Sequence, residues 1–81
     1  MDTYTLKERK DTDEYHLFIC TNRNKKCYPA PQSVCKEMHN SESIRNIFVC
    51  KDEDEARIKC AEIGRQVCGT CVSHLYETYN K

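Results

Sequence analysis

The sequence predicts a small α+β fold, in which an antiparallel sheet of about three strands packs against a long C-terminal helix. Two patterns favour this class. Short segments in the first two thirds of the chain have the alternation or the apolar, β-branched character of strands. The last third instead places apolar residues at steps of three and four, as an amphipathic helix does. A chain of 81 residues predicts one domain, residues 1–81.

The predicted strands are residues 3–9, 14–21 and 44–51. The first alternates polar and apolar residues, which is typical of a half-buried strand. Residues 10–13, "KDTD", have side chains that cap backbone turns. The first two strands therefore most simply pair as a hairpin.

The second and third strands carry a repeated ending, "FIC" at Cys20 and "FVC" at Cys50. If these strands are neighbours in register, Phe18 and Phe48 line a common face together with the two cysteines, since alternate residues share a face. The repeat then indicates packing before it indicates ligands. A disulfide between Cys20 and Cys50 is an alternative for the same arrangement.

Residues 28–43 are predicted to be irregular. Pro29 and Pro31 exclude a central strand, because proline cannot donate a ladder hydrogen bond. Pro31 can begin a short helix, with Val34 and Met38 facing inward.

A helix is predicted over residues 53–79. The acidic run 52–55 favours a helix start, because carboxylates interact well with the positive end of the helix dipole. A continuous helix would be about 40 Å long. Gly64 and Gly69 weaken it, so a break within 64–69 is expected. The apolar positions are Ala56, Cys60, Ile63, Val67, Cys71, Leu75 and Tyr79.

Charge and hydropathy exclude several function classes. The 13 basic and 13 acidic side chains cancel, whereas nucleic-acid and membrane-surface binders usually have basic excess. No apolar run approaches the ~20 residues of a membrane span, and the N-terminus lacks the apolar core of a secretory signal. The seven cysteines are an odd number, which favours free thiols in a reducing compartment. We therefore predict a cytoplasmic protein that binds neither nucleic acid nor membrane.

The sharpest chemical candidate is "CGTC", because Cys68 and Cys71 have the spacing of half a tetrahedral zinc site. Cys35 and His39 could complete the set, since residues four apart share a helix face. The candidate metal ligands are thus Cys35, His39, Cys68 and Cys71, with zinc as the candidate cofactor. The competing interpretation is that the cysteines pack as small hydrophobes in a core.

Catalysis is not predicted. Thioredoxin-like chemistry needs its Cys-x-x-Cys at a helix start directly after a strand, whereas this motif follows a helical pattern. Neither a glycine-rich elbow around a serine nor a phosphate loop occurs, and the chain has only two glycines. We predict a non-enzyme.

Residues 44–77 resemble the last strand and closing helix of the pleckstrin-homology and phosphotyrosine-binding superfold. The resemblance lies in a strand ending Phe-x-Cys, a short acidic connection and a long amphipathic helix. Cys60 stands where pleckstrin-homology members usually carry a tryptophan, and the chain is short for seven strands. No phosphoinositide or phosphotyrosine motif is matched, so no binding residues are implied. The matching residues are Phe48, Cys50, the acids 52–55, Ala56, Cys60, Ile63, Gly64 and Leu75.

These observations predict a small protein-interaction or regulatory module that binds a protein or peptide through its sheet edge or its C-terminal helix. That helix could also form a homodimer. One alternative is a regulatory domain stabilised by structural zinc at "CGTC". A second alternative is a secreted, disulfide-bonded factor.

Overall fold

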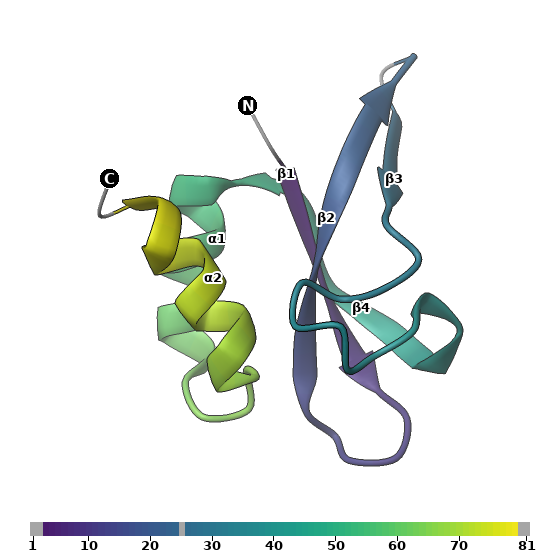
Figure 1. Cartoon of the computed structure of the whole chain (residues 1–81), viewed down its shortest axis with the longest axis vertical. Coiled ribbons are helices and arrows are strands. Elements are labelled where there is room, and N and C mark those ends of the chain that lie inside the picture. The colour runs from purple at the N-terminus through teal and green to yellow at the C-terminus, as the bar shows by residue number, and fades with distance from the viewer. Residues whose placement is uncertain (1–2, 25, 80–81) are drawn as a thin grey trace.

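The computed structural model describes residues 3–24 and 26–79, with side chains as far as Tyr76. It confirms the α+β class: two helices lie side by side against one side of a curled antiparallel sheet (Figure 1). The elements in chain order are β1 (Thr3–Arg9), β2 (Tyr15–Arg23), β3 (Lys26–Pro29), the 3-10 turn η1 (Asn40–Glu42), β4 (Ser43–Asp52), α1 (Glu53–Ile63) and α2 (Gly69–Tyr79).

The sheet has four strands in the order β3-β2-β1-β4. β1, β2 and β4 correspond to the predicted strands 3–9, 14–21 and 44–51. β3 was not predicted, because residues 28–43 were expected to be irregular and Pro29 excluded a central strand. β3 tolerates this proline since it is a short edge strand, where a missing ladder hydrogen bond costs little.

The central strand β1 separates the two repeated "F-x-C" endings. Leu6 pairs with Leu17 on β2 and with Phe48 on β4, and all three belong to one buried cluster. Phe18 pairs with Thr5 and therefore points to the opposite face. The expectation that Phe18 and Phe48 share a face is wrong, because their strands are not neighbours and the β1–β4 register shifts beside Leu6.

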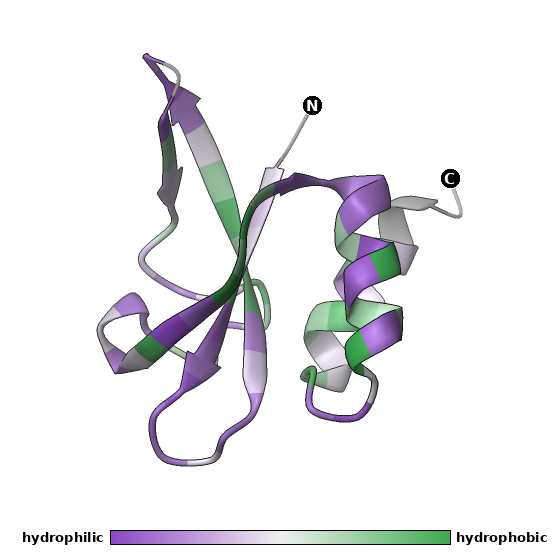
Figure 2. Ribbon diagram, turned by 180° about the vertical axis from the view of Figure 1, so that it is seen from behind, coloured by the Kyte–Doolittle hydropathy of each residue, from purple (hydrophilic) through white to green (hydrophobic). Residues whose placement is uncertain are grey.

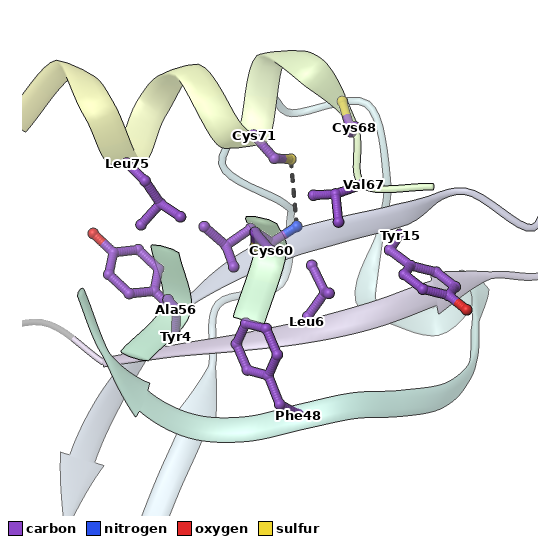
Figure 3. Close-up of a cluster of buried hydrophobic side chains, with 11 residues drawn as sticks. Tyr4, Leu6, Tyr15, Phe48, Ala56, Cys60, Val67, Cys68, Cys71 and Leu75 are labelled. Atoms are coloured by element: carbon purple, nitrogen blue, oxygen red, sulfur yellow. Dashed lines mark hydrogen bonds between the residues drawn. The ribbon is translucent and has the colours of Figure 1, made fainter. Parts of the chain in front are cut away.

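The main core lies between the sheet and the helices (Figure 3). Strand residues supply large side chains, and the helices supply mostly small ones, which lets the two layers approach closely. Hydrophobic and hydrophilic residues alternate along the strands and helices (Figure 2). The buried cluster contains Tyr4, Leu6, Tyr15, Leu17, Phe48, Ala56, Cys60, Val67, Cys68, Cys71 and Leu75.

The predicted helix 53–79 is broken, as the glycines suggested. α1 ends before Gly64, whose φ of 82° lies in the left-handed region that favours glycine. The linker then pairs with the edge of β2: the Tyr15 N–H donates to the Gln66 carbonyl at 2.7 Å, and the Cys68 N–H donates to the Tyr15 carbonyl at 2.8 Å. Those two bonds place the start of α2 against β2.

The short helix expected after Pro31 does not form. Lys36 has a φ of 64°, which no continuous helix accommodates. Met38 is nevertheless fully buried, as expected, and Val34 is partly buried. The segment from residue 30 to residue 39 is a loop that crosses beside β2 (Figure 1). We call it the 30–39 loop.

One disulfide joins Cys27 on β3 to Cys50 on β4. These strands are the two opposite edges of the sheet, so the bond links edges that the curl brings together. The Cys20–Cys50 pairing considered from the sequence is wrong, since Cys20 is a free thiol. Cys35, Cys60, Cys68 and Cys71 are also free.

Neither helix, within the ranges that the structure describes, has the length and apolar character needed to cross a membrane.

Candidate metal centre

Four side chains that could hold a metal ion converge at the edge of β2. Each offers one donor atom: a ring nitrogen of His16, and the Sγ atom of Cys35, Cys68 or Cys71. These four atoms all lie within 4.8 Å of one another. His16, Cys68 and Cys71 are buried, and Cys35 is partly exposed. We call this group the Cys₃His cluster.

The backbone of β2 organises the cluster. β3 pairs with β2 only from Cys20 onward, so the edge of β2 around His16 is available to other segments. The Val34 N–H donates to the Leu17 carbonyl at 2.8 Å, and Cys68 bonds to Tyr15 on the other side of His16. The 30–39 loop and the start of α2 are thus fixed on either side of the His16 imidazole.

Cys35 lies in a tight turn of the 30–39 loop. The Lys36 N–H donates to the Ser33 carbonyl at 2.9 Å, and the Ser33 N–H donates to the Met38 carbonyl at 2.8 Å. The buried Met38 side chain anchors the far end of this turn. The Ser33 hydroxyl lies 3.2 Å from Cys35 Sγ, so it contacts the sulfur that the turn presents to the cluster.

Cys68 and Cys71 bracket the first turn of α2. Cys68 immediately precedes Gly69, the first helical residue, and its carbonyl accepts from the Val72 N–H at 3.1 Å. The Leu17 N–H donates to Cys71 Sγ at 3.3 Å, the bond drawn as a dashed line in Figure 3. Such N–H donors stabilise a thiolate, because they offset its negative charge.

The distances within the cluster fit a tetrahedral zinc ion. Zn–S bonds of 2.3 Å and Zn–N bonds near 2.0 Å place neighbouring ligand atoms about 3.5–3.8 Å apart in a tetrahedron. The Sγ atoms of Cys35 and Cys68 are 3.9 Å apart, and Cys71 Sγ lies 3.8 Å from His16 Nδ1. His16 Nδ1 lies 3.3 Å from Cys35 Sγ. These three distances are close to the tetrahedral values, and the remaining pairs of donor atoms lie within 4.8 Å of one another.

The second imidazole nitrogen of His16 faces a carboxylate. Nε2 lies 2.8 Å from Glu14 Oε1, although the contact is too poorly aligned to count as a hydrogen bond. Metal-bound histidines almost always direct their other nitrogen to a carboxylate, a carbonyl or water, which fixes the ring. A small rotation of the exposed Glu14 side chain would give His16 that support.

The surroundings of Cys35 and Cys71 shift the pKa values of these two thiols in opposite directions. Burial raises the pKa of Cys71 far above its ordinary value. Burial also raises the pKa of Cys35, but contacts with the Ser33 hydroxyl and the Glu37 backbone outweigh it, so the net pKa of Cys35 is lowered. A divalent cation would favour the thiolate form of each, because it supplies the positive charge that the buried site lacks.

The structure brings together Cys35, Cys68 and Cys71 from the set predicted by sequence. His39 is not in the cluster: it is exposed and precedes η1, where its backbone N–H donates to Glu42 Oε1 at 2.9 Å. Pairing Cys35 with His39 assumed a helix, and the turn at Lys36 removes that geometry.

Sequence reasoning missed His16. This strand is apolar on both faces, and His16 lies on the face opposite Tyr15 and Leu17, which gave no reason to place it near "CGTC". The one available signal was a histidine inside an otherwise apolar strand. Its position relative to Cys71, 55 residues later, depends on tertiary structure alone.

No family model, no curated protein and no solved structure matches the chain. The resemblance of residues 44–77 to the pleckstrin-homology superfold therefore stays a prediction.

Proposed function

We propose that this chain is a zinc-binding domain in which the metal has a structural role. The observation that carries the proposal is the convergence of four donor atoms, one imidazole nitrogen and three sulfurs, within 4.8 Å of one another. These donors come from three segments that are distant in sequence: β2, the 30–39 loop and the start of α2.

The donor set favours zinc over harder cations. Thiolates and imidazole suit zinc, whereas magnesium and calcium prefer oxygen ligands. Four protein donors fill a tetrahedral shell, and a catalytic zinc site instead keeps one position for water or substrate. The Cys₃His cluster thus supports a closed, structural site.

Such a site would stabilise a fold that has little core of its own. A chain of this length hides only slightly more than ~60% of its unfolded surface. Metal binding contributes about 10–16 kcal/mol of apparent free energy in small zinc domains, largely as folding free energy. Here it would join the 30–39 loop and α2 to the sheet.

The test is zinc content and stability of protein purified without chelator. We expect about one zinc ion per chain by elemental analysis, because the cluster offers one tetrahedral set. Cobalt substitution should give the absorption bands of tetrahedral thiolate coordination. Removing the metal with a chelator should unfold the chain or lower its melting temperature strongly.

Two matched variants separate ligation from packing. Cys71→Ala and Cys60→Ala each remove a buried sulfur from the same core, but only Cys71 belongs to the cluster. We expect Cys71→Ala to abolish zinc binding and Cys60→Ala to retain it. Equal zinc content in both variants, or none in the unmodified protein, would contradict the proposal.

A protein-binding role is the second candidate, and the edge strand β4 favours it. No described strand pairs with the outer edge of β4, although the disulfide joins its Cys50 to β3, and Ile44 and Val49 on this strand are 55% and 47% exposed. An extended peptide could add to this edge through main-chain hydrogen bonds.

This candidate is tested by selecting peptides against the zinc-loaded protein and measuring amide hydrogen exchange with a selected peptide. Protection concentrated in β4, with binding weakened by Val49→Lys, is the expected result. Protection elsewhere in the chain would reject β4 as the docking edge.

A further inference from the structure

The four donors of the Cys₃His cluster differ in accessibility. His16 and Cys71 are fully buried and Cys68 is 5% exposed, whereas Cys35 is partly exposed. Cys35 also differs in its support: it lies in the 30–39 loop, whereas the others lie in β2 or at the start of α2. A reagent from solvent therefore meets Cys35 before the other sulfurs.

The Cys68 thiol lies next to Cys35. The Sγ atoms of Cys35 and Cys68 are 3.9 Å apart, and a disulfide requires about 2.05 Å. Cys35 is in a loop whose anchors are Val34, bonded to Leu17, and the buried Met38. Closing the gap needs a shift of the turn between those anchors and no movement of β2 or α2.

We propose that Cys35 is an oxidation site for peroxides, and that a Cys35–Cys68 disulfide formed there releases the metal. The inference rests on the proposed zinc-binding function and adds its regulation. Redox sensing typically needs an accessible thiolate beside a resolving cysteine. Cys35 and Cys68 supply these two roles.

Peroxide oxidises the two thiols in two steps. The Cys35 thiolate attacks one peroxide oxygen, the O–O bond breaks, and Cys35 becomes a sulfenic acid while the other oxygen leaves as hydroxide, which takes a proton from solvent to give water. The Cys68 thiolate then attacks the Cys35 sulfur, the S–O bond breaks, and that oxygen also leaves as hydroxide and is protonated by solvent. Two thiols lose two electrons and one peroxide gains them. Only His16 and Cys71 remain as donors, too few to hold zinc.

The cysteines outside the cluster offer no equivalent route. Cys27 and Cys50 are already joined to each other. Cys20 and Cys60 are buried and lie outside the cluster. A new disulfide that involves Cys35 is therefore distinguishable from the existing bond by peptide mapping.

The experiment treats zinc-loaded protein with one equivalent of hydrogen peroxide in the presence of a chromogenic zinc chelator. We expect zinc release together with a peptide that contains the Cys35–Cys68 disulfide, and recovery of zinc binding after reduction by a dithiol. Cys35→His keeps a four-donor set but removes the accessible thiol. It should bind zinc and release it at least about tenfold more slowly, because the attacking thiolate is gone.

Cys60→Ala is the control, and it should release zinc at the rate of the unmodified protein. If Cys35→His does not bind zinc, the test uses the unmodified protein alone. Cys35 and Cys68 should then be the first of its thiols that peroxide oxidises. Protein that carries zinc but retains it under peroxide, or forms a disulfide other than Cys35–Cys68, overturns this inference alone. Protein that carries no zinc before oxidation overturns the proposed function as well.

Discussion

The disulfide and the Cys₃His cluster connect distant parts of the chain in different ways. Cys27 and Cys50 are 23 residues apart and join the two edges of the sheet, and Cys50 is exposed. The cluster instead spans 55 residues from His16 to Cys71, and three of its four members are buried. The first joins the two edges of the curled sheet, and the second, with the proposed zinc ion bound, would attach the 30–39 loop and the start of α2 to the sheet.

This difference indicates which connection the fold depends on. β1 already pairs with both β2 and β4, so the disulfide adds to a sheet that hydrogen bonds also hold. The 30–39 loop and the linker before α2 have fewer such bonds to β2, namely those of the Ala30, Val34, Tyr15 and Cys68 N–H groups. We therefore expect the two connections to fail independently and with different effects.

Among changes that leave the four donors in place, the largest effect is expected from removing the disulfide. The double variant Cys27→Ser/Cys50→Ser should lower the free energy of unfolding by about 3 kcal/mol, because the unfolded chain regains the entropy of a loop of this length. Urea denaturation measures it. Zinc content should not change.

A reductant that does not bind metals provides the control for that prediction. It should destabilise the unmodified protein as the two serines do, and it should have no effect on the double variant. Loss of zinc in the double variant would show that the disulfide and the Cys₃His cluster are coupled, which would contradict the expectation that they fail independently.

Glu14→Ala tests the cluster without touching the disulfide. Loss of the carboxylate beside His16 Nε2 should weaken zinc binding about 10- to 100-fold, as removal of such supporting partners typically does. Competition with a chelator of known affinity measures the change. Glu62→Ala, at an exposed position of α1, is the matched control. Equal zinc affinity in both variants would mean that Glu14 does not support His16.

The smallest effect is expected at Asp52, which belongs neither to the disulfide nor to the Cys₃His cluster. Its Oδ1 accepts the Glu55 N–H at 2.8 Å and caps α1. Asp52→Ala should lower the free energy of unfolding by about 1 kcal/mol, and Asp52→Asn should largely restore it, because asparagine caps equally well. Thermal denaturation measures both. A change in zinc affinity would show that α1 transmits strain to the cluster.

The local parts of this structure were predictable from sequence, and the long-range parts were not. The alternation of 3–9 located β1, and the glycines located the break between α1 and α2. Each of these depends on residues that are near in sequence. β3 was not predicted because Pro29 excludes a central strand, and the sequence does not show that β3 lies at an edge of the sheet.

The residues of the candidate site also divide into those that a local pattern predicted and those that depend on long-range contacts. Cys68 and Cys71 were found because their spacing is itself the signal, and Cys35 was grouped with them as a second half-site. His16 joins them only because β2, the 30–39 loop and the linker after α1 meet at one edge, which no local pattern specifies. The partner of Cys50 depends likewise on the curl of the sheet.

The order of the ligands along the chain has a consequence for biosynthesis. His16 and Cys35 lie in the first half, whereas Cys68 and Cys71 come near the end. A ribosome therefore exposes two lone donors long before the remaining two emerge. The proposed zinc site therefore cannot hold its ion tightly until the start of α2 has been translated, so the last of the four donors sets the earliest point at which the site can form.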